Sequence, residues 1–154
     1  MSELMIAEVA HDDVNLHRLI DKLDEDLLQR YPAEEVFVLD FSDPAIKNVV
    51  FMVAYSGETA IGCGAIKPLD ETFMELKRFY VEPQFRKNGV AGEILQKLEA
   101  KAKEKKAAYI RLETGAPQPE AIGFYKKHGY YEIEKYGEYV DCESSLCYEK
   151  SLGS

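Results

Sequence analysis

The sequence predicts an α/β fold built on a mixed sheet. Two observations support this prediction: strand-like and helix-like patterns alternate along the chain, and a tight turn joins two of the strands into an antiparallel hairpin. The expected order of elements is β-α-β-β-β-α-β-α-β-β. A chain of 154 residues is long enough to bury a core of its own, so we expect residues 1–154 to form a single domain.

The first part of the chain is expected to hold one strand and one helix. The strand covers residues 4–9, and Asp12 or Asp13 is placed to cap the helix that follows it. The helix is expected to end near Pro32, and residues 33–48 have no regular period. Its apolar residues recur mostly every three or four positions, as in an amphipathic helix: Leu16, Leu19, Ile20, Leu23, Leu27 and Leu28.

The middle of the chain is expected to hold a hairpin and a third strand. Apolar and β-branched residues predict hairpin strands over 49–55 and 59–66, and a third strand over 75–81. Two glycines of the second strand, Gly62 and Gly64, suggest a close neighbour or a bulge. In the third strand the apolar spacing is first three and then two, which predicts a β-bulge: Leu76, Phe79 and Val81.

The remaining elements continue the alternation of helices and strands. They are a helix from residue 90, a strand over 109–114, a helix over 119–128, and two closing strands over 130–136 and 146–150. Gly129 is expected to end the last helix, because glycine adopts the left-handed conformation found after a helix C-terminus. Residues 137–145 form a long loop between the closing strands, and long loops are often functional.

One stretch, residues 86–92, has the chemistry of an anion site. A strand turns here into a helix, and the free N–H groups at a helix N-terminus bind anions. Gly89 lets the backbone approach a ligand closely, while Arg86 and Lys87 add positive charge. The pattern is neither a dinucleotide fingerprint nor a nucleotide P-loop. We therefore expect a phosphate or pyrophosphate here.

Two motifs resemble those of the GNAT N-acetyltransferase superfamily. The first matches that family's acetyl-coenzyme A signature and reads Arg86-x-x-Gly89-x-Ala91. The second is similar to a later motif in which a tyrosine sits beside the coenzyme sulfur, and it reads Gln118-x-x-Ala121-Ile122-x-Phe124-Tyr125-x-x-x-Gly129-Tyr130. Two motifs in this order are more specific than either alone. The resemblance covers residues 49–150 and is to small single-domain members of bacterial type.

The resemblance implies a mostly antiparallel sheet whose central strand pair is bulged and splayed, with helices on its flanks. It also implies acetyl-CoA as co-substrate and no metal. The cofactor-binding residues that it implies are Phe79, Tyr80, Val81, Arg86, Lys87, Asn88, Gly89, Val90, Ala91, Gly92, Gln118 and Phe124. Gln118 departs from the family pattern, which commonly has asparagine at this position, and a longer amide there is expected to contact the pantetheine arm.

Acetyl transfer to an amine needs a base for the ammonium and an acid for the leaving thiolate. The resemblance points to Glu75 as the base, because many relatives carry a catalytic glutamate at this place. Tyr125 is the expected acid, since a phenol of pKa about 10 can protonate a thiolate. Glu113, at the end of the next strand, is the alternative base. Two plainer interpretations stay open, with Glu75 as a partner of Lys77 and Tyr125 as a core residue.

The acceptor is expected to be a small-molecule amine. A formal charge of −9 argues against nucleic acid or an anionic membrane as a partner and suits a cationic substrate. The acceptor cleft is expected between the early helices and the loop over 137–145. The residues expected to form its wall are Tyr31, Glu113, Tyr136 and Tyr139, with Glu34, Glu35 or Asp141 as charge partners.

Further expectations concern the cellular compartment, metal sites, alternative functions and the oligomeric state. The sequence has neither a signal peptide nor an apolar run of membrane length, which favours a cytoplasmic protein. Three cysteines without C-x-x-C spacing suggest neither a zinc site nor a disulfide framework. A GNAT module that only binds acyl-CoA, and an enzyme that acetylates a protein amine, are the alternative functions. A homodimer is left open.

Overall fold

The computed structural model describes residues 4–115 and 118–153. Within them the strands are β1 (Leu4–Val9), β2 (Val50–Ser56), β3 (Thr59–Pro68), β4 (Phe73–Val81), β5 (Tyr109–Gly115), β6 (Tyr131–Ile133) and β7 (Ser145–Ser151). The α-helices are α1 (Val14–Arg30), α2 (Val90–Glu104) and α3 (Pro119–Lys127). Short 3-10 helices are η1 (Ala33–Glu35), η2 (Pro44–Asn48), η3 (Pro83–Phe85) and η4 (Gly137–Tyr139). None of the described helices is long and apolar enough to cross a membrane.

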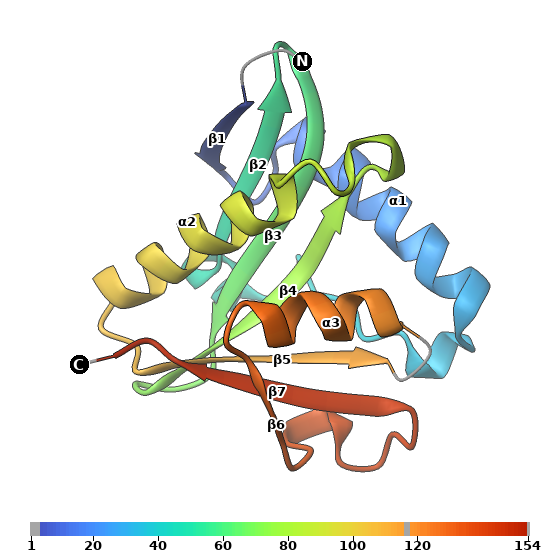
Figure 1. Cartoon of the computed structure of the whole chain (residues 1–154), viewed down its shortest axis with the longest axis vertical. Coiled ribbons are helices and arrows are strands. Elements are labelled where there is room, and N and C mark those ends of the chain that lie inside the picture. Colours follow the sequence, from blue (N-terminus) through green and yellow to red (C-terminus); the bar gives the residue numbers. More distant parts are fainter. Residues whose placement is uncertain (1–3, 116–117, 154) are drawn as a thin grey trace.

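The strands form one mixed sheet, as the sequence predicts. Their order is β1-β2-β3-β4-β5-β7-β6, and every neighbouring pair is antiparallel except β4 and β5. Alternate residues of β2 contribute to two separate clusters of buried side chains, since Met52 packs with α2 and Phe51 packs with α1. Helices α2 and α3 therefore cover one face of the sheet and α1 covers the other (Figure 1).

Helix α1 begins and ends at residues that the sequence marks. Asp13, one of the two expected caps, accepts a hydrogen bond from the backbone N–H of Leu16 at 2.9 Å. The helix stops at Arg30 because Pro32 lies two residues further on. Leu28 was expected on the apolar face, but it is 53% exposed, so that expectation was wrong at this residue. At 3.6 residues per turn, Leu28 falls outside the arc of the helix that the buried residues Leu16, Leu19, Ile20 and Leu23 occupy.

The two glycines of β3 allow helix α2 to approach the sheet closely. A Cβ atom on Gly64 would lie 2.9 Å from side-chain atoms of both Leu98 and Phe79, and one on Gly62 would lie 3.0 Å from Ile94. The predicted bulge lies opposite Gly64, where the β3–β4 register shifts and Arg78 has φ of 51°. Both expectations, a close neighbour and a bulge, are confirmed.

The centre of the sheet is split. Strands β4 and β5 pair only where Phe73–Glu75 faces Tyr109–Arg111, and beyond these residues they separate. The other edge of β5 pairs with β7 along its whole length, so the gap opens on the β4 side alone. The splayed central pair that the resemblance implies is confirmed (Figure 1).

The C-terminal hairpin is shorter than predicted on one side. Gly129 has φ of 93° after α3, as expected of a glycine beyond a helix C-terminus. Strand β6 ends at Ile133 rather than at Tyr136, so the predicted strand was too long. Tyr136 leaves the sheet edge, and its hydroxyl donates a hydrogen bond of 2.7 Å to the Glu75 carboxylate. A tertiary contact thus replaces the strand pairing there.

Candidate active site

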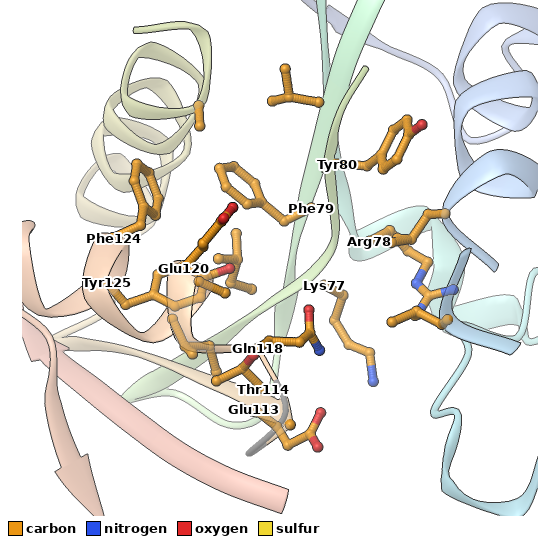
Figure 2. Close-up of a pocket in the computed structure, with 18 of the residues that line it drawn as sticks. Lys77, Arg78, Phe79, Tyr80, Glu113, Thr114, Gln118, Glu120, Phe124 and Tyr125 are labelled. Atoms are coloured by element: carbon orange, nitrogen blue, oxygen red, sulfur yellow. The ribbon is translucent and has the colours of Figure 1, made fainter. Parts of the chain in front are cut away.

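A continuous cleft of about 1070 Å³ follows the split in the sheet. At one end it reaches the turn before α2, and at the other it reaches the C-terminal part of α1 and η1. Its middle is lined by the bulged part of β4, the end of β5 and the first turns of α3 (Figure 2). The cleft therefore connects residues expected to bind the coenzyme with residues expected to form the acceptor wall.

The turn before α2 has the backbone conformation of an anion site. Gly89 caps the helix with φ of 82°, and no atom lies within 4 Å of the position where its Cβ would be. The first helical hydrogen bond runs from the N–H of Glu93 to the carbonyl of Gly89. The three N–H groups of residues 90–92 therefore have no partner within the helix and are free for an anion.

The two cations of this turn differ in their contacts. Arg86 donates from Nε to the carbonyl oxygen of Val81 at 2.8 Å, and its guanidinium lies 5.6 Å from the ring centre of Tyr80. Lys87 is exposed, so its ammonium can reach an anion at this turn. Arg86 thus fixes the end of β4, while Lys87 supplies charge.

The structure places the expected cofactor residues in two groups. Ten of them line the cleft: Phe79, Tyr80, Val81, Arg86, Lys87, Gly89, Ala91, Gly92, Gln118 and Phe124. Val90 is instead 1% exposed and packs into the core from the first turn of α2, so its side chain is not available to a ligand. Asn88 is exposed and is not among the residues that line the cleft.

Tyr125 lies in the wall of the cleft near its middle. Its ring packs against those of Phe79, Phe124 and Tyr130, with centroid distances of 5.4 to 6.3 Å. Burial raises the pKa of Tyr125 above its usual value, and the nearby charge of Glu113 raises it further. The phenol therefore keeps its proton at neutral pH and can act as a hydrogen-bond donor or an acid in the cleft.

Glu113 faces the cleft from the end of β5. Its carboxylate accepts a hydrogen bond of 2.6 Å from the hydroxyl of Ser145. Burial raises the pKa of Glu113, while the bond from Ser145 and the charge of Lys77 lower it, and the net shift is upward. Glu113 and Lys77 project from β5 and β4 into the same opening (Figure 2). A carboxylate with a raised pKa in a cleft suits a general base.

Glu75 occupies a different position from Glu113. It is only 2% exposed and is not among the residues that line the cleft. Its carboxylate accepts the hydrogen bond from Tyr136 and lies 3.8 Å from the ammonium of Lys77. The same ammonium donates to the hydroxyl of Tyr139 at 3.1 Å. Glu75 thus lies behind Lys77, in the arrangement that the plainer interpretation of the sequence describes.

The expected acceptor residues are also divided by the structure. Tyr31, Glu113 and Tyr139 line the cleft, whereas Tyr136 turns toward Glu75. The hydroxyl of Tyr31 accepts a hydrogen bond of 2.9 Å from the side-chain amide of Gln118. Three of the four residues therefore line the same cleft.

An acidic hollow of about 580 Å³ adjoins this end of the cleft. The carboxylates in its lining are Glu34, Glu35, Glu138, Asp141 and Glu143. Glu35, Phe37 and Ser144 line both the hollow and the cleft, and Ser144 donates a hydrogen bond to Glu35. The expected charge partners thus lie together, next to the opening that Lys77 and Glu113 share.

Two buried cations of β4 were not recognised as site residues from the sequence. Lys77 and Arg78 are each 7% exposed and line the cleft. The guanidinium of Arg78 pairs with Asp24 of α1 and donates to the carbonyl of Phe37 at 3.0 Å, which ties the acceptor wall to the bulge. The available signal was two adjacent cations next to Glu75 inside a strand whose other residues are apolar or aromatic, because such charges are rarely buried unless paired.

Comparisons with known proteins agree with this geometry. The model of the acetyltransferase (GNAT) family matches residues 16–130. The chain is 34% identical over 136 residues to an IAA acetyltransferase of Azospirillum brasilense, covering 88% of this chain and 89% of that protein. A Klebsiella pneumoniae structure, solved as a candidate acyl-CoA N-acyltransferase, aligns with a TM-score of 0.86 at 32% identity, covering 97% of this chain and 98% of that one.

A third comparison concerns the fold alone. A GNAT acetyltransferase of Elizabethkingia anophelis, solved with acetyl-CoA bound, aligns with a TM-score of 0.73 at 16% identity. The alignment covers 98% of this chain and 99% of that one. Together with the bulged β4, the split sheet and the open helix N-terminus, the matches show that the chain belongs to the GNAT family of N-acetyltransferases.

Proposed function

We propose that the protein transfers an acetyl group from acetyl-CoA to the primary amine of a small molecule, by direct attack while both substrates are bound. The observation that carries the proposal is the single cleft, which has an anion site at one end and an acidic hollow at the other. Glu113 and Tyr125 face the cleft between these ends.

The coenzyme end of the cleft fits acetyl-CoA. The free N–H groups of residues 90–92 and the ammonium of Lys87 would hold the pyrophosphate, since the space beside Gly89 is open. The gap beside β4 would take the pantetheine arm, with Gln118 near its middle. When bound, acetyl-CoA supplies the acetyl thioester, and these residues align it with the opening in front of Glu113.

We propose Glu113, rather than Glu75, as the base. Glu113 lines the cleft and its raised pKa suits removal of a proton from an ammonium, whereas Glu75 lies behind Lys77 and is bound by Tyr136. Tyr125 would give its phenolic proton to the sulfur as the carbon–sulfur bond breaks and the nitrogen–carbon bond forms. Glu75 would keep Lys77 in place beside Glu113.

Direct attack is supported by the state of the cysteines. Burial raises the pKa of Cys63 to about 12 and also raises that of Cys147, so neither forms a thiolate readily at neutral pH. Cys142 lines the acidic hollow and not the cleft. None of the three is therefore placed to carry the acetyl group.

The acidic hollow supports a cationic acceptor. Glu35, Glu138 and Asp141 attract an ammonium and repel an acidic substrate, and the negative balance of the whole chain acts in the same direction. The rings of Tyr31 and Tyr139 give the cleft apolar surface beside these charges. A small amine with an aliphatic or aromatic body fits this combination.

The test is a turnover assay with acetyl-CoA and a panel of amines, in which the released thiol is detected. The panel contains aliphatic diamines, aromatic amines, amino acids and a peptide with a free N-terminus. We expect thiol release with a cationic small amine. Binding of acetyl-CoA without thiol release on any amine would favour a non-catalytic module, and release on the peptide alone would favour a protein acceptor.

A further inference from the structure

Tyr31 and Gln118 form a bridge across the cleft. Tyr31 caps the C-terminus of α1, and Gln118 stands at the N-terminus of α3, 87 residues further along the chain. The Gln118 amide donates to the Tyr31 hydroxyl at 2.9 Å, and both residues line the cleft. The C-terminal end of α1 lies close to the tip of β5 and the start of α3 (Figure 1).

The fold leaves room for this bridge at Gly115. A Cβ atom on Gly115 would lie 1.8 Å from the hydroxyl oxygen of Tyr31 and 2.5 Å from its ring carbon Cζ. Any side chain at this position would therefore displace the tyrosine. The glycine at the end of β5 is a second feature, separate from the hydrogen bond, that places Tyr31 beside Gln118.

The side chain of Gln118 is flexible, and it must be held in one conformation to bind a ligand. Its amide has two N–H donors and one carbonyl acceptor on a chain of three rotatable bonds, one more than asparagine has. An unrestrained glutamine loses rotational freedom when a ligand binds, and this loss weakens binding. A neighbour that fixes the amide beforehand removes that cost. Tyr31 binds one N–H, and among the described residues the carbonyl oxygen and the second N–H have no other partner, so both can meet a ligand in the cleft.

We infer that Tyr31, although it belongs to the acceptor wall, is a positioning residue for the coenzyme. It holds the Gln118 amide in the orientation that meets an amide of the pantetheine arm. The inference rests on the proposed function, since it takes acetyl-CoA as the ligand of the cleft. Tyr31 then makes a longer side chain at position 118 as effective as a shorter, stiffer amide would be.

The experiment measures two dissociation constants by calorimetry. One ligand is acetyl-CoA, and the other is adenosine 3′,5′-bisphosphate, which carries the nucleotide but no pantetheine. Tyr31→Phe should weaken acetyl-CoA binding about 3- to 10-fold, the effect of leaving one side chain to be ordered on binding, and should leave the bisphosphate unchanged. In a Gln118→Ala background, Tyr31→Phe should have no further effect.

Two further variants sharpen the result. Gln118→Asn should bind acetyl-CoA with the same affinity whether residue 31 is tyrosine or phenylalanine, because the shorter amide needs no support. Tyr55→Phe removes another tyrosine hydroxyl, one that Asn15 binds at 3.3 Å, and serves as the matched control with unchanged binding.

Three results would overturn the inference while leaving the proposed function intact. In the first, Tyr31→Phe binds acetyl-CoA as tightly as the parent protein does. In the second, Tyr31→Phe loses the same affinity for acetyl-CoA and for the bisphosphate. In the third, Tyr31→Phe still weakens acetyl-CoA binding in the Gln118→Ala background. If the parent protein itself neither binds acetyl-CoA nor releases thiol, the proposed function is overturned instead. Binding and turnover in the parent protein thus separate the two failures.

Discussion

The two ends of the cleft are built in different ways. The end proposed to bind the coenzyme consists mainly of backbone, since Gly89 and the N–H groups of residues 90–92 form it and the cations beside it are exposed. The end proposed to bind the acceptor consists of side chains from distant parts of the chain, and Lys77 and Tyr139 of this end are joined with Glu75 behind them in one buried group. A backbone site depends on a few adjacent residues, whereas a side-chain site depends on how the elements pack.

The largest effect is expected at the base. Glu113→Gln keeps the shape of the side chain and its bond to Ser145 but removes proton acceptance, so kcat should fall by about 10²- to 10⁴-fold. Glu75→Gln should lower kcat less than about 10-fold and lower the free energy of unfolding by about 1 to 3 kcal/mol, because buried Lys77 loses a partner. Steady-state kinetics and thermal unfolding of both variants check this. The opposite ranking of the two kcat values would make Glu75 the base.

The next effect tests the backbone site. Gly89→Asp places a negative charge at the helix N-terminus and a Cβ atom at φ of 82°, so the rise in Tm caused by acetyl-CoA should disappear. Gly57→Asp is the matched control, because Gly57 also has positive φ, 62°, but lies in the β2–β3 turn. Both variants should lose stability of about 1–2 kcal/mol from backbone strain. If acetyl-CoA still raised the Tm of Gly89→Asp, the anion site would have to lie elsewhere in the protein.

Tyr125, the proposed acid, lines the cleft between its two ends. Tyr125→Phe should lower kcat roughly 10²-fold and leave the affinity for acetyl-CoA within a few-fold, since the ring packing is kept. Tyr130→Phe makes the same change in the same cluster, but its hydroxyl binds Glu99 at 2.9 Å, so kcat should not change. Single-turnover kinetics separates the chemical step from binding. An unchanged kcat in Tyr125→Phe would indicate that solvent, and not Tyr125, protonates the leaving sulfur.

A smaller effect tests the acidic hollow. KM for a cationic amine should rise about 2- to 5-fold when ionic strength increases from roughly 0.05 to 0.5 M, because salt screens the carboxylates. Asp141→Asn should reduce this dependence, while Glu71→Gln, an exposed residue of the β3–β4 turn, should not. A KM that is indifferent to both salt and Asp141 would remove the hollow from acceptor binding.

The smallest effect concerns stability and pH. Because burial raises the pKa of Glu113 above its ordinary value of 4.5, the folded protein holds this proton more tightly than the unfolded chain. The stabilisation of the folded state by protonated Glu113 is complete below pH 4.5, and it is lost as the pH rises through the pKa of Glu113 in the folded protein. Glu113→Gln should therefore raise Tm at pH 8 and lose this advantage at pH 4. A variant that is less stable than the parent at pH 8 would contradict the direction of the shift.

The sequence by itself determined the order of the strands and helices, the bulge and the glycine turn that is proposed as the anion site. The bulge follows from the spacing of Leu76, Phe79 and Val81, and the anion site follows from Gly89 between a strand and a helix. These features depend on backbone conformation and on the spacing of apolar residues, and both are set by residues that are close together in the sequence. The family motifs are likewise short runs of sequence, so they could be recognised without the fold.

Only the tertiary structure decided which side chains meet in the cleft. Glu75 and Glu113 are both strand carboxylates in sequence, but packing places Tyr136 and Lys77 against the first and opens the second to the cleft. The Tyr31–Gln118 bond joins residues 87 positions apart. Burial and partners depend on elements that fold from distant parts of the chain, and no local pattern encodes them.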